Sequence, residues 1–379
     1  MPQLLAVVAC TAVLVQGGYF PALFLWAGAA LAAALLLSRR ELRCPMALWP
    51  LLGLSGWYIL SSLVNGPTAA GLSQASLPLV CCLFALHCLS LEESERREML
   101  VWMGRFSGGA AVVAILAFFG ILPIPGSVTA QRLQFTFQYV NAAAAWFGTV
   151  LLLRGELRDR WVDRLCPFVA VALLLTRSAG GIGTYLVIQA VVLLARFGKR
   201  NWKAWAGAGL AGLVGVIAVA TRFQQALGTF QERLVQSADG MKGMLAAPLF
   251  GYGAGNWPEV KWMFQTYEYR AQVVHNSYVQ AGVEAGFPAL IFLAAAVALA
   301  VLLMKGRSPA LKGAAVLIPF HAVMDFTLSF FAVDALAIAI FALPAQRKGK
   351  ALPRWAVWIA GAVCVVFFVL LAVLRRPIG

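Results

Sequence analysis

A single histidine, His275, stands directly before a segment with the signals of a helix start. Ser277 and Gln280 fit a capping box, so the sequence predicts a helix that begins at Ser277 and leaves His275 just outside its N-terminus. Unpaired backbone N–H groups and the helix dipole attract anions at such a position. The same dipole disfavours a protonated imidazole, so we expect His275 to be neutral at neutral pH and able to act as a general base.

Four arginines are expected to share the side of the membrane on which this histidine lies: Arg132, Arg177, Arg222 and Arg233. Guanidinium groups stay charged and bind phosphate oxygens bidentately, which makes these side chains candidates for binding a diphosphate. Together they suggest group transfer, in which the histidine deprotonates an acceptor hydroxyl and the arginines stabilise a departing lipid diphosphate. The simpler explanation is that these arginines anchor helix ends at the membrane surface.

The predicted helix after the histidine carries further polar groups before it becomes apolar. Asn276, Gln280 and Glu284 follow one stripe, which we expect to lie at headgroup depth and to contribute to substrate binding. Gly286 and Pro288 follow, and they predict a kink. This arrangement places the histidine at the level where lipid diphosphates lie.

A second polar pair, His321 and Asp325, is spaced as i and i+4 inside an apolar segment predicted to span the membrane. Ionisable groups within a membrane are costly and are functional by default, so both are candidate substrate-binding residues. A buried pair that satisfies itself is the alternative explanation.

The elements that must position these residues are membrane helices. With 61% hydrophobic and 12% charged residues and a mean hydropathy of +0.82, the chain has too little polar surface for a soluble globule. We therefore predict an all-α integral membrane protein, a polytopic bundle of about 12 or 13 transmembrane helices in a single domain (residues 1–379). The predicted spans are 3–16, 20–37, 46–64, 75–91, 99–121, 135–153, 165–180, 181–195, 204–220, 277–304, 313–329, 331–345 and 355–374.

The net charge of +15 reflects membrane topology. Of the 30 Lys and Arg residues, 21 fall on one alternating set of loops and helix ends, which the positive-inside rule assigns to the cytoplasm. The charge therefore implies no nucleic-acid partner, and membrane lipid is the expected environment. The chain is predicted to be a multi-pass protein of a bacterial cytoplasmic (inner) membrane with its active face on the extracytoplasmic side.

One long connection, residues 221–274, is predicted to be a large extracytoplasmic insertion that carries part of the active site. Apolar residues at helical spacing from Phe223 to Leu234 predict an amphipathic helix on the membrane surface. A break follows at residues 248–255, and a second helix is predicted from Pro258, carrying aromatic residues as far as Tyr269. The acids of this loop are scattered, so we predict neither a metal site nor a cofactor.

The residues around the histidine resemble a known family. His275, Asn276, Gln280, Glu284 and Gly286 follow the pattern His-Asn-x-x-x-Gln-x-x-x-Glu-x-Gly of the bacterial O-antigen ligase/polymerase family of membrane glycosyltransferases. Upstream, Arg233 and the stretch Pro-Leu-Phe-Gly-Tyr-Gly at 248–253 resemble the family's Arg and its Pro-Leu-x-Gly-x-Gly segment.

Looser matches extend this resemblance over residues 130–335. Residues 175–180 resemble a helix end of the family, with Arg177 and Ser178 in the opposite order, and residues 131–141 resemble one of its helix starts. His321 and Asp325 resemble its later His-x-x-x-Asp.

The resemblance implies an undecaprenyl-diphosphate-linked oligosaccharide or polysaccharide donor, an inverting mechanism without a metal, and an extracytoplasmic active site. The acceptor is left open between a lipid A core sugar, the growing glycan and a protein hydroxyl, and we favour the ligase with its lipid A core. A flippase or other transporter of lipid-linked glycans is the alternative of another class, and a non-catalytic scaffold is the third. A transporter would place charged residues deep within several spans, whereas here they collect on one face.

Overall fold

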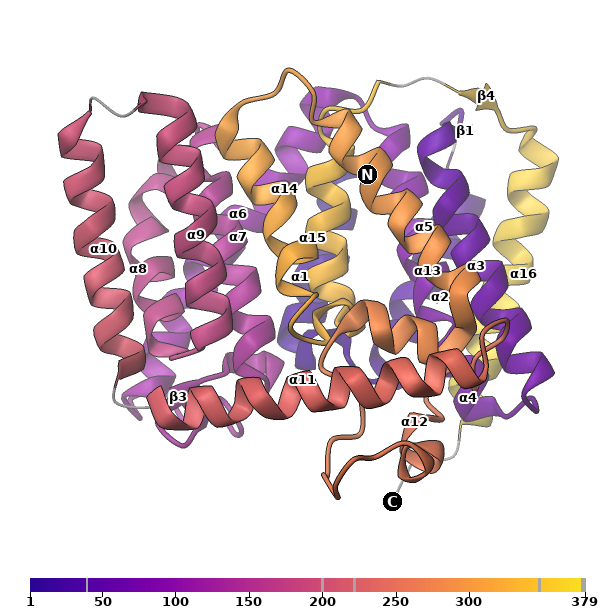
Figure 1. The fold of residues 1–379 in the computed structure, drawn as a ribbon. Coiled ribbons are helices and arrows are strands. Elements are labelled where there is room, and N and C mark those ends of the chain that lie inside the picture. The colour runs from indigo at the N-terminus through magenta and orange to yellow at the C-terminus, as the bar shows by residue number, and fades with distance from the viewer. Residues whose placement is uncertain (39, 199–200, 221–222, 347–348, 376–379) are drawn as a thin grey trace.

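The computed structural model describes the chain except residues 39, 199–200, 221–222, 347–348 and 376–379. Of these described residues, 76% are helical and almost none are in strands, which confirms the predicted all-α membrane fold (Figure 1). The helices of the main bundle are α1 (Pro2–Leu14), α2 (Pro21–Leu37), α3 (Trp49–Val64), α5 (Leu77–Ser90), α6 (Glu93–Phe118), α7 (Val140–Leu157), α8 (Arg160–Leu175), α9 (Ala179–Phe197), α10 (Trp202–Ala220), α13 (Ser277–Leu303), α14 (Pro309–His321), α15 (Phe331–Ala342) and α16 (Arg354–Leu374).

Shorter elements join these helices. They are the α-helices α4 (Ala69–Ala75), α11 (Phe223–Ala246) and α12 (Trp257–Val260), the 3₁₀ turns η1 (Gln16–Gly18), η2 (Met46–Leu48), η3 (Phe135–Phe137), η4 (Lys261–Met263) and η5 (Thr327–Ser329), and the strands β1 (Arg43–Cys44), β2 (Val128–Thr129), β3 (Arg132–Leu133) and β4 (Lys350–Ala351). The strands form two antiparallel pairs, β1 with β4 and β2 with β3.

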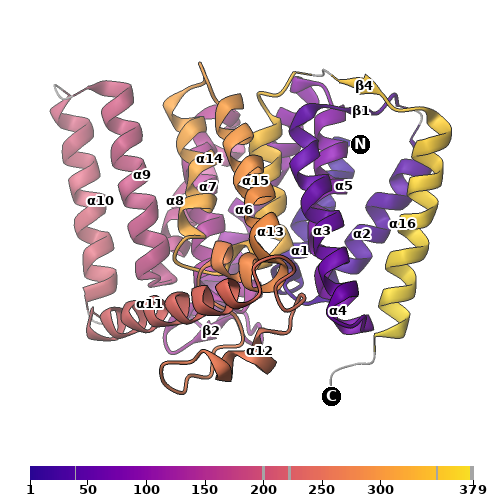
Figure 2. The same cartoon turned by 45° about the vertical axis from the view of Figure 1, so that its right-hand side comes forward.

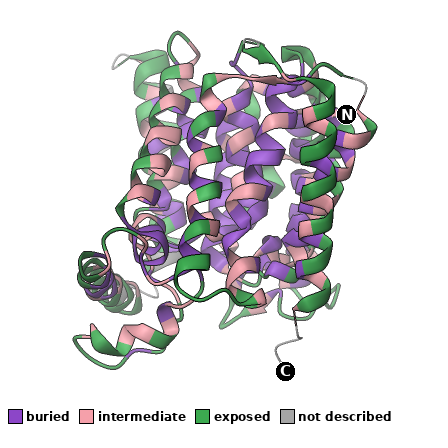
Figure 3. Ribbon diagram, turned by 90° about the vertical axis from the view of Figure 1, so that its right-hand side faces the viewer, coloured by how far each residue is buried: buried purple, intermediate pink, exposed green. Residues whose placement is uncertain are grey.

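The bundle has the length and surface of a multi-pass membrane protein. Within the described residues, six helical stretches are long and apolar enough to cross a bilayer: 46–64, 69–90, α6, α9, α13 and α16. Figure 3 shows buried residues facing the interior of the bundle and exposed ones on its outer surface. Many of the exposed side chains are large and apolar, such as Val187, Ile291 and Val363, as expected of helices that contact lipid.

The two ends of the bundle differ in charge and in structure. Figures 1 and 2 both show α11 lying across one end, whereas β1, β4 and the connection from α13 to α14 lie at the opposite end. That opposite end carries cations such as Arg43, Lys305 and Arg307. The loops that the sequence assigns to the cytoplasm therefore lie opposite α11.

The long connection between α10 and α13 contains the predicted surface helix. That helix, α11, continues to Ala246, and Leu227, Phe230 and Leu234 on it are half exposed. This exposure suits a helix whose apolar side chains enter the membrane surface. A second helix begins next to Pro258 as predicted, but its predicted extent to Tyr269 is wrong, because only α12 and the turn η4 form there.

A buried carboxylate on α11 gives the reason that the second helix is short. Asp239 accepts hydrogen bonds from the backbone N–H of Thr266, at 3.0 Å, and from its hydroxyl, at 2.7 Å. These bonds hold Thr266 against α11, so the aromatic residues after it lie in an irregular segment. Burial alone would raise the pKa of Asp239, but the hydrogen bonds from Lys242 and Thr266 lower it below its usual value.

The kink predicted in α13 is present, at Ala285 and Gly286, which have non-helical backbone angles. At this kink, the backbone of loop 248–253 forms hydrogen bonds with the backbone of α13. The N–H groups of Tyr252 and Gly253 donate to the carbonyls of Val283 and Glu284, at 2.8 and 2.9 Å. Backbone groups released by the kink are thus satisfied by the loop, as buried polar groups must be.

Two glycines allow these backbones to approach. A Cβ atom on Gly251 would lie 2.4 Å from the carbonyl oxygen of Val283, and one on Gly286 would lie 2.3 Å from that of Leu249. Both glycines also have positive φ angles, of +59° and +74°. The contact between loop 248–253 and α13 therefore requires glycine at both positions, Gly251 in the loop and Gly286 in the helix.

Two predicted spans have different boundaries in the structure. The predicted span 313–329 is helical only to His321, where α14 ends, so Asp325 lies in the connection to α15 and not one helical turn from His321. The helix expected from residue 135 begins at Val140, because residues 135–138 form a 3₁₀ turn with left-handed backbone angles at Phe135 and Gln138.

We predict that Gly251→Ala destabilises the protein by about 1–3 kcal/mol, because its methyl group meets a backbone carbonyl and its φ is strained. The matched control is Gly109→Ala in α6, where a Cβ meets nothing within 4 Å, and alanine there favours the helix. Thermal unfolding of both variants in detergent measures the difference. Equal stability of the two variants would contradict the proposed role of the loop contact.

Candidate active site

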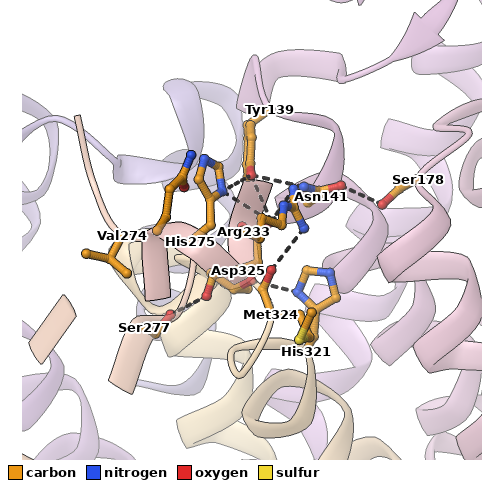
Figure 4. A network of polar contacts seen from close by, with 12 residues as sticks. Tyr139, Asn141, Ser178, Arg233, Val274, His275, Ser277, His321, Met324 and Asp325 are labelled. Atoms are coloured by element: carbon orange, nitrogen blue, oxygen red, sulfur yellow. Dashed lines mark hydrogen bonds and ion pairs between the residues drawn. The ribbon is translucent and has the colours of Figure 1, made fainter. Parts of the chain in front are cut away.

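The carboxylate of Asp325 is the centre of a buried polar network at the α11 end of the bundle (Figure 4). Its side chain is completely buried, and one oxygen, Oδ2, accepts three hydrogen bonds or ion-pair contacts. The partners are the Asn141 amide at 2.6 Å, the Tyr139 hydroxyl at 2.8 Å and Nη2 of Arg233 at 3.1 Å. Residues from α7, α11 and the α14–α15 connection therefore meet at a single atom.

His275 approaches the same carboxylate. Its Nδ1 lies 4.0 Å from Oδ2 of Asp325 and 3.5 Å from the hydroxyl of Tyr139. The imidazole packs edge-on against Phe326, with ring centroids 5.0 Å apart, and its side chain is 20% exposed. Because Nδ1 faces the carboxylate, Nε2 points away from it, which is the arrangement of a base whose orientation is set by an acid.

The start of α13 fixes the histidine through the backbone of Asp325. The carbonyl of Asp325 accepts hydrogen bonds from the hydroxyl of Ser277, at 2.8 Å, and from its N–H, at 3.0 Å. The predicted start at Ser277 is confirmed, but the capping box is wrong. The cap is Asn276, whose side chain accepts from Tyr278 and Val279, because the hydroxyl of Ser277 is bound to the neighbouring loop.

Gln280 and Glu284 hold the chain on either side of the site. Gln280 accepts a hydrogen bond from the N–H of Val274, at 2.7 Å, and donates to Glu284 at 2.8 Å. Glu284 also accepts from the N–H of Gly255, at 3.1 Å, and from the hydroxyl of Tyr58, at 3.2 Å. These side chains tie the residue before His275 and the loop after α11 to the first turns of α13.

Arg233 and His321 bring unpaired polar atoms to the network. Arg233 binds the carbonyl of Met324 at 2.9 Å in addition to Asp325, and His321 uses Nδ1 to contact Thr327 at 2.7 Å. Nε of Arg233, Nε2 of His321 and Oδ1 of Asp325 are buried without a hydrogen-bond partner. Buried groups of this kind are costly unless a ligand or water pairs with them. The network is therefore equipped to take a further polar ligand.

The backbone of Gly180 lies next to the side chains of His321 and Arg233. A Cβ on Gly180, in the first turn of α9, would lie 3.7 Å from Nε2 of His321 and 4.0 Å from Nη1 of Arg233. Ser178 caps α9 and donates to the amide oxygen of Asn141 at 2.6 Å, so this helix start is bound to the network.

The other predicted arginines lie around this helix start. Arg132, in β3, donates to the carbonyl of Thr176 at 3.3 Å, and Arg177 donates to Gln131 at 3.4 Å. These two arginines therefore contact segments next to the network, whereas Arg233 is bonded to Asp325 itself. Arg222 lies outside the described residues.

Sequence reasoning did not select Tyr139, Asn141 or Ser178 as site residues. The available signal was the presence of two polar residues, Tyr139 and Asn141, at the start of the otherwise apolar helix α7. Apart from the hydrogen bond that Asn141 donates to Tyr139, these contacts join residues more than 30 positions apart in the chain, so no local spacing could have revealed them.

The electrostatics favour an ionised carboxylate at the centre of the site. Burial would raise the pKa of Asp325, but the close approach of the His275 imidazole and the charge of Arg233 outweigh burial and hold the pKa below its usual value. The resulting stabilisation is complete above the unfolded-state pKa and is lost as the pH falls through the lowered folded-state pKa. The network is thus intact at neutral pH.

Comparison with known proteins agrees with the family resemblance. Residues 165–294 match the family model described as O-Antigen ligase. The match runs from α8 through α11 into α13 and includes Arg177, Arg233 and His275. No curated protein matches the chain. The resemblance inferred from the motifs is thereby confirmed over residues 165–294, whereas the looser matches at 131–141 and at His321 and Asp325 lie outside the matched range.

We predict that Asp325→Asn destabilises the protein by about 3–5 kcal/mol, because Arg233 is left as a buried charge without its counter-ion. Replacing Arg233 by Gln in the same chain should recover part of this loss. Unfolding of the two single variants and the double variant measures the coupling.

The control for this cycle is Asp163→Asn, which removes the half-exposed ion pair with Arg154. We expect this change to cost less than about 1 kcal/mol. If Asp325→Asn were as mild as the control, the network would not be the structural centre that its geometry indicates.

Proposed function

We propose that this chain, whose residues 165–294 match the O-Antigen ligase family, is a membrane glycosyltransferase that joins a glycan to an acceptor hydroxyl on the extracytoplasmic face. The donor is a glycan linked to undecaprenyl diphosphate, and among the possible acceptors we favour a lipid A core sugar. The observation that carries the proposal is the shared carboxylate of Asp325, which brings the imidazole of His275 and the guanidinium of Arg233 into one site.

In this proposal His275 is the general base. Nε2 takes the proton of the acceptor hydroxyl, and the oxygen attacks the anomeric carbon of the donor sugar. The bond from this carbon to the diphosphate oxygen breaks, and its electron pair leaves with the diphosphate. Asp325 acts as a positioning residue, because its carboxylate orients Nδ1 and stabilises the imidazolium that forms. A single displacement of this kind inverts the anomeric configuration.

The arginines would stabilise the leaving group. Arg233 offers an unpaired Nε and its guanidinium lies next to Gly180 at the start of α9, and Arg132 and Arg177 border the same helix start. Guanidinium groups and the N-terminus of α9 both favour the negative charge that develops on the departing diphosphate. These charges can fulfil the role that a divalent ion has in other glycosyltransferases, so the proposed reaction is metal-independent.

The family match leaves the acceptor open, and polymerisation of the glycan or its transfer to protein would use the same donor chemistry. Flipping of the lipid-linked glycan is the alternative of another class. A flippase needs polar groups along a path through the bilayer, whereas the network described above lies at the α11 end of the bundle.

We predict that His275→Ala lowers the transfer rate by about 10²–10⁴-fold, the usual contribution of a general base. The assay uses the purified protein in proteoliposomes, undecaprenyl-diphosphate-linked glycan, and lipopolysaccharide that lacks O-antigen as acceptor. His87→Gln is the control, because His87 is buried on α5 and bonds to the carbonyl of Leu31. Undiminished transfer by His275→Ala would rule out the proposed base, and loss of donor flipping in the same liposomes would favour the transporter.

A further inference from the structure

A cavity of about 220 Å³ lies on the side of α13 that faces α3 and α5, whereas α9, which follows Arg177, lies on the other side of α13 (Figures 1 and 2). It is lined mainly by α3, α5, α13 and α15, and its lining residues on α13 run from Ser277 to Leu303, the whole length of that helix. It is larger than the ~150 Å³ apolar cavity that is known to hold a benzene ring. An elongated apolar chain is therefore a suitable occupant.

The cavity begins beside the catalytic histidine. Val273 and Ser277, two residues before and two residues after His275, both line it. None of the residues that join Asp325 from the opposite flank, namely Arg233, Asn141 and Tyr139, belongs to its lining. The histidine thus separates a flank with arginines from a flank with an apolar cavity.

Polar and apolar side chains occupy opposite ends of the cavity. The end next to the histidine carries Tyr19, Gln74 and Glu284, whereas the far end is formed by Leu89, Leu303 and other apolar residues: Ala47, Phe341 and Ala342. This distribution suits a lipid whose chains lie in the bilayer and whose polar part reaches the histidine.

The charge of the lining discriminates between two lipid substrates. Its charged residues in the described chain are the acids Glu284 and Asp334, and it includes neither lysine nor arginine. A diphosphate attached directly to a prenyl chain would meet carboxyl groups here without a cation to bind it, whereas the opposite flank offers guanidinium groups. Carboxyl and tyrosine hydroxyl groups are suited to hydrogen bonding with uncharged hydroxyls.

Asp334 strengthens this distinction. It lies in the first turn of α15 and faces the cavity, and the thiol of Cys81 donates to it at 3.6 Å. An acid within an apolar wall is costly unless it serves a purpose, and this one is not used by the proposed transfer chemistry. It provides a hydrogen-bond acceptor for a hydroxyl group that enters the cavity.

We infer that this cavity holds the lipid anchor of the acceptor, with the donor diphosphate on the arginine flank. The inference rests on the proposed function and narrows the acceptor to a lipid-anchored, hydroxyl-bearing molecule. It also places the nucleophile and the leaving group on opposite sides of the reacting carbon, as an inverting displacement requires.

The first test fills the cavity. Ala296→Trp on α13 places a large ring in the cavity, and Ile291→Trp is the matched control, because Ile291 lies on the same helix, is 66% exposed and is absent from the lining. We expect Ala296→Trp to raise the KM for lipopolysaccharide without O-antigen by about ten-fold or more, equivalent to about 1.4 kcal/mol. The KM for the donor, and transfer to the delipidated core oligosaccharide, should match those of the control.

A rise in the donor KM, or an unchanged KM for lipopolysaccharide, would overturn the inference while leaving the proposed transfer intact. Failure of the unmodified protein to transfer glycan to either acceptor would instead reject the proposed function.

The second test does not depend on catalysis or on tolerance of a large ring. Benzoylphenylalanine at position 296 is irradiated in nanodiscs that contain radiolabelled lipopolysaccharide without O-antigen, or radiolabelled undecaprenyl diphosphate. Crosslinking to the lipopolysaccharide, and its absence with the same probe at position 291, supports the inference. Crosslinking to undecaprenyl diphosphate instead, or to neither lipid, contradicts it.

Discussion

The structure depends on the burial of one carboxylate. Asp325 is removed from solvent, which is unfavourable for a charge unless ion pairing and hydrogen bonds compensate it. That compensation comes from Arg233 on α11 and from Tyr139 and Asn141 at the start of α7. The backbone carbonyl of Asp325 also accepts a hydrogen bond from the hydroxyl of Ser277 on α13. One ionised group therefore sets the relative positions of segments that are far apart in the chain, and His275 is held at their junction.

The break in α13 is the second constraint. A straight helix from Ser277 to Leu303 would satisfy its own backbone and leave loop 248–253 without partners. The kink instead exchanges backbone hydrogen bonds with this loop, and Trp57 donates to the carbonyl of Ala285 at 2.8 Å. The short segment before the kink is thereby oriented independently of the rest of the helix. Its direction determines where His275 points.

The sequence was sufficient for features that depend on local pattern. Hydropathy predicted the bundle helices, helical spacing predicted α11, and the glycine and proline of α13 predicted its kink. The cap was misassigned because Asn276 and Ser277 can both cap a helix, and only the loop that carries Asp325 decides between them.

Features that depend on tertiary contacts could not be predicted from local sequence patterns. Asp325 was expected inside a span because its neighbours are apolar, yet those neighbours pack around a buried connection. Tyr139 and Ser178 become recognisable only when distant segments meet. Helix α11 fixes a further property of the molecule, because it lies across one end of the bundle and is bonded to the buried polar network through Arg233. The depth of the network below α11 is therefore fixed within the fold, and a thicker or thinner bilayer would be accommodated at the opposite end of the bundle.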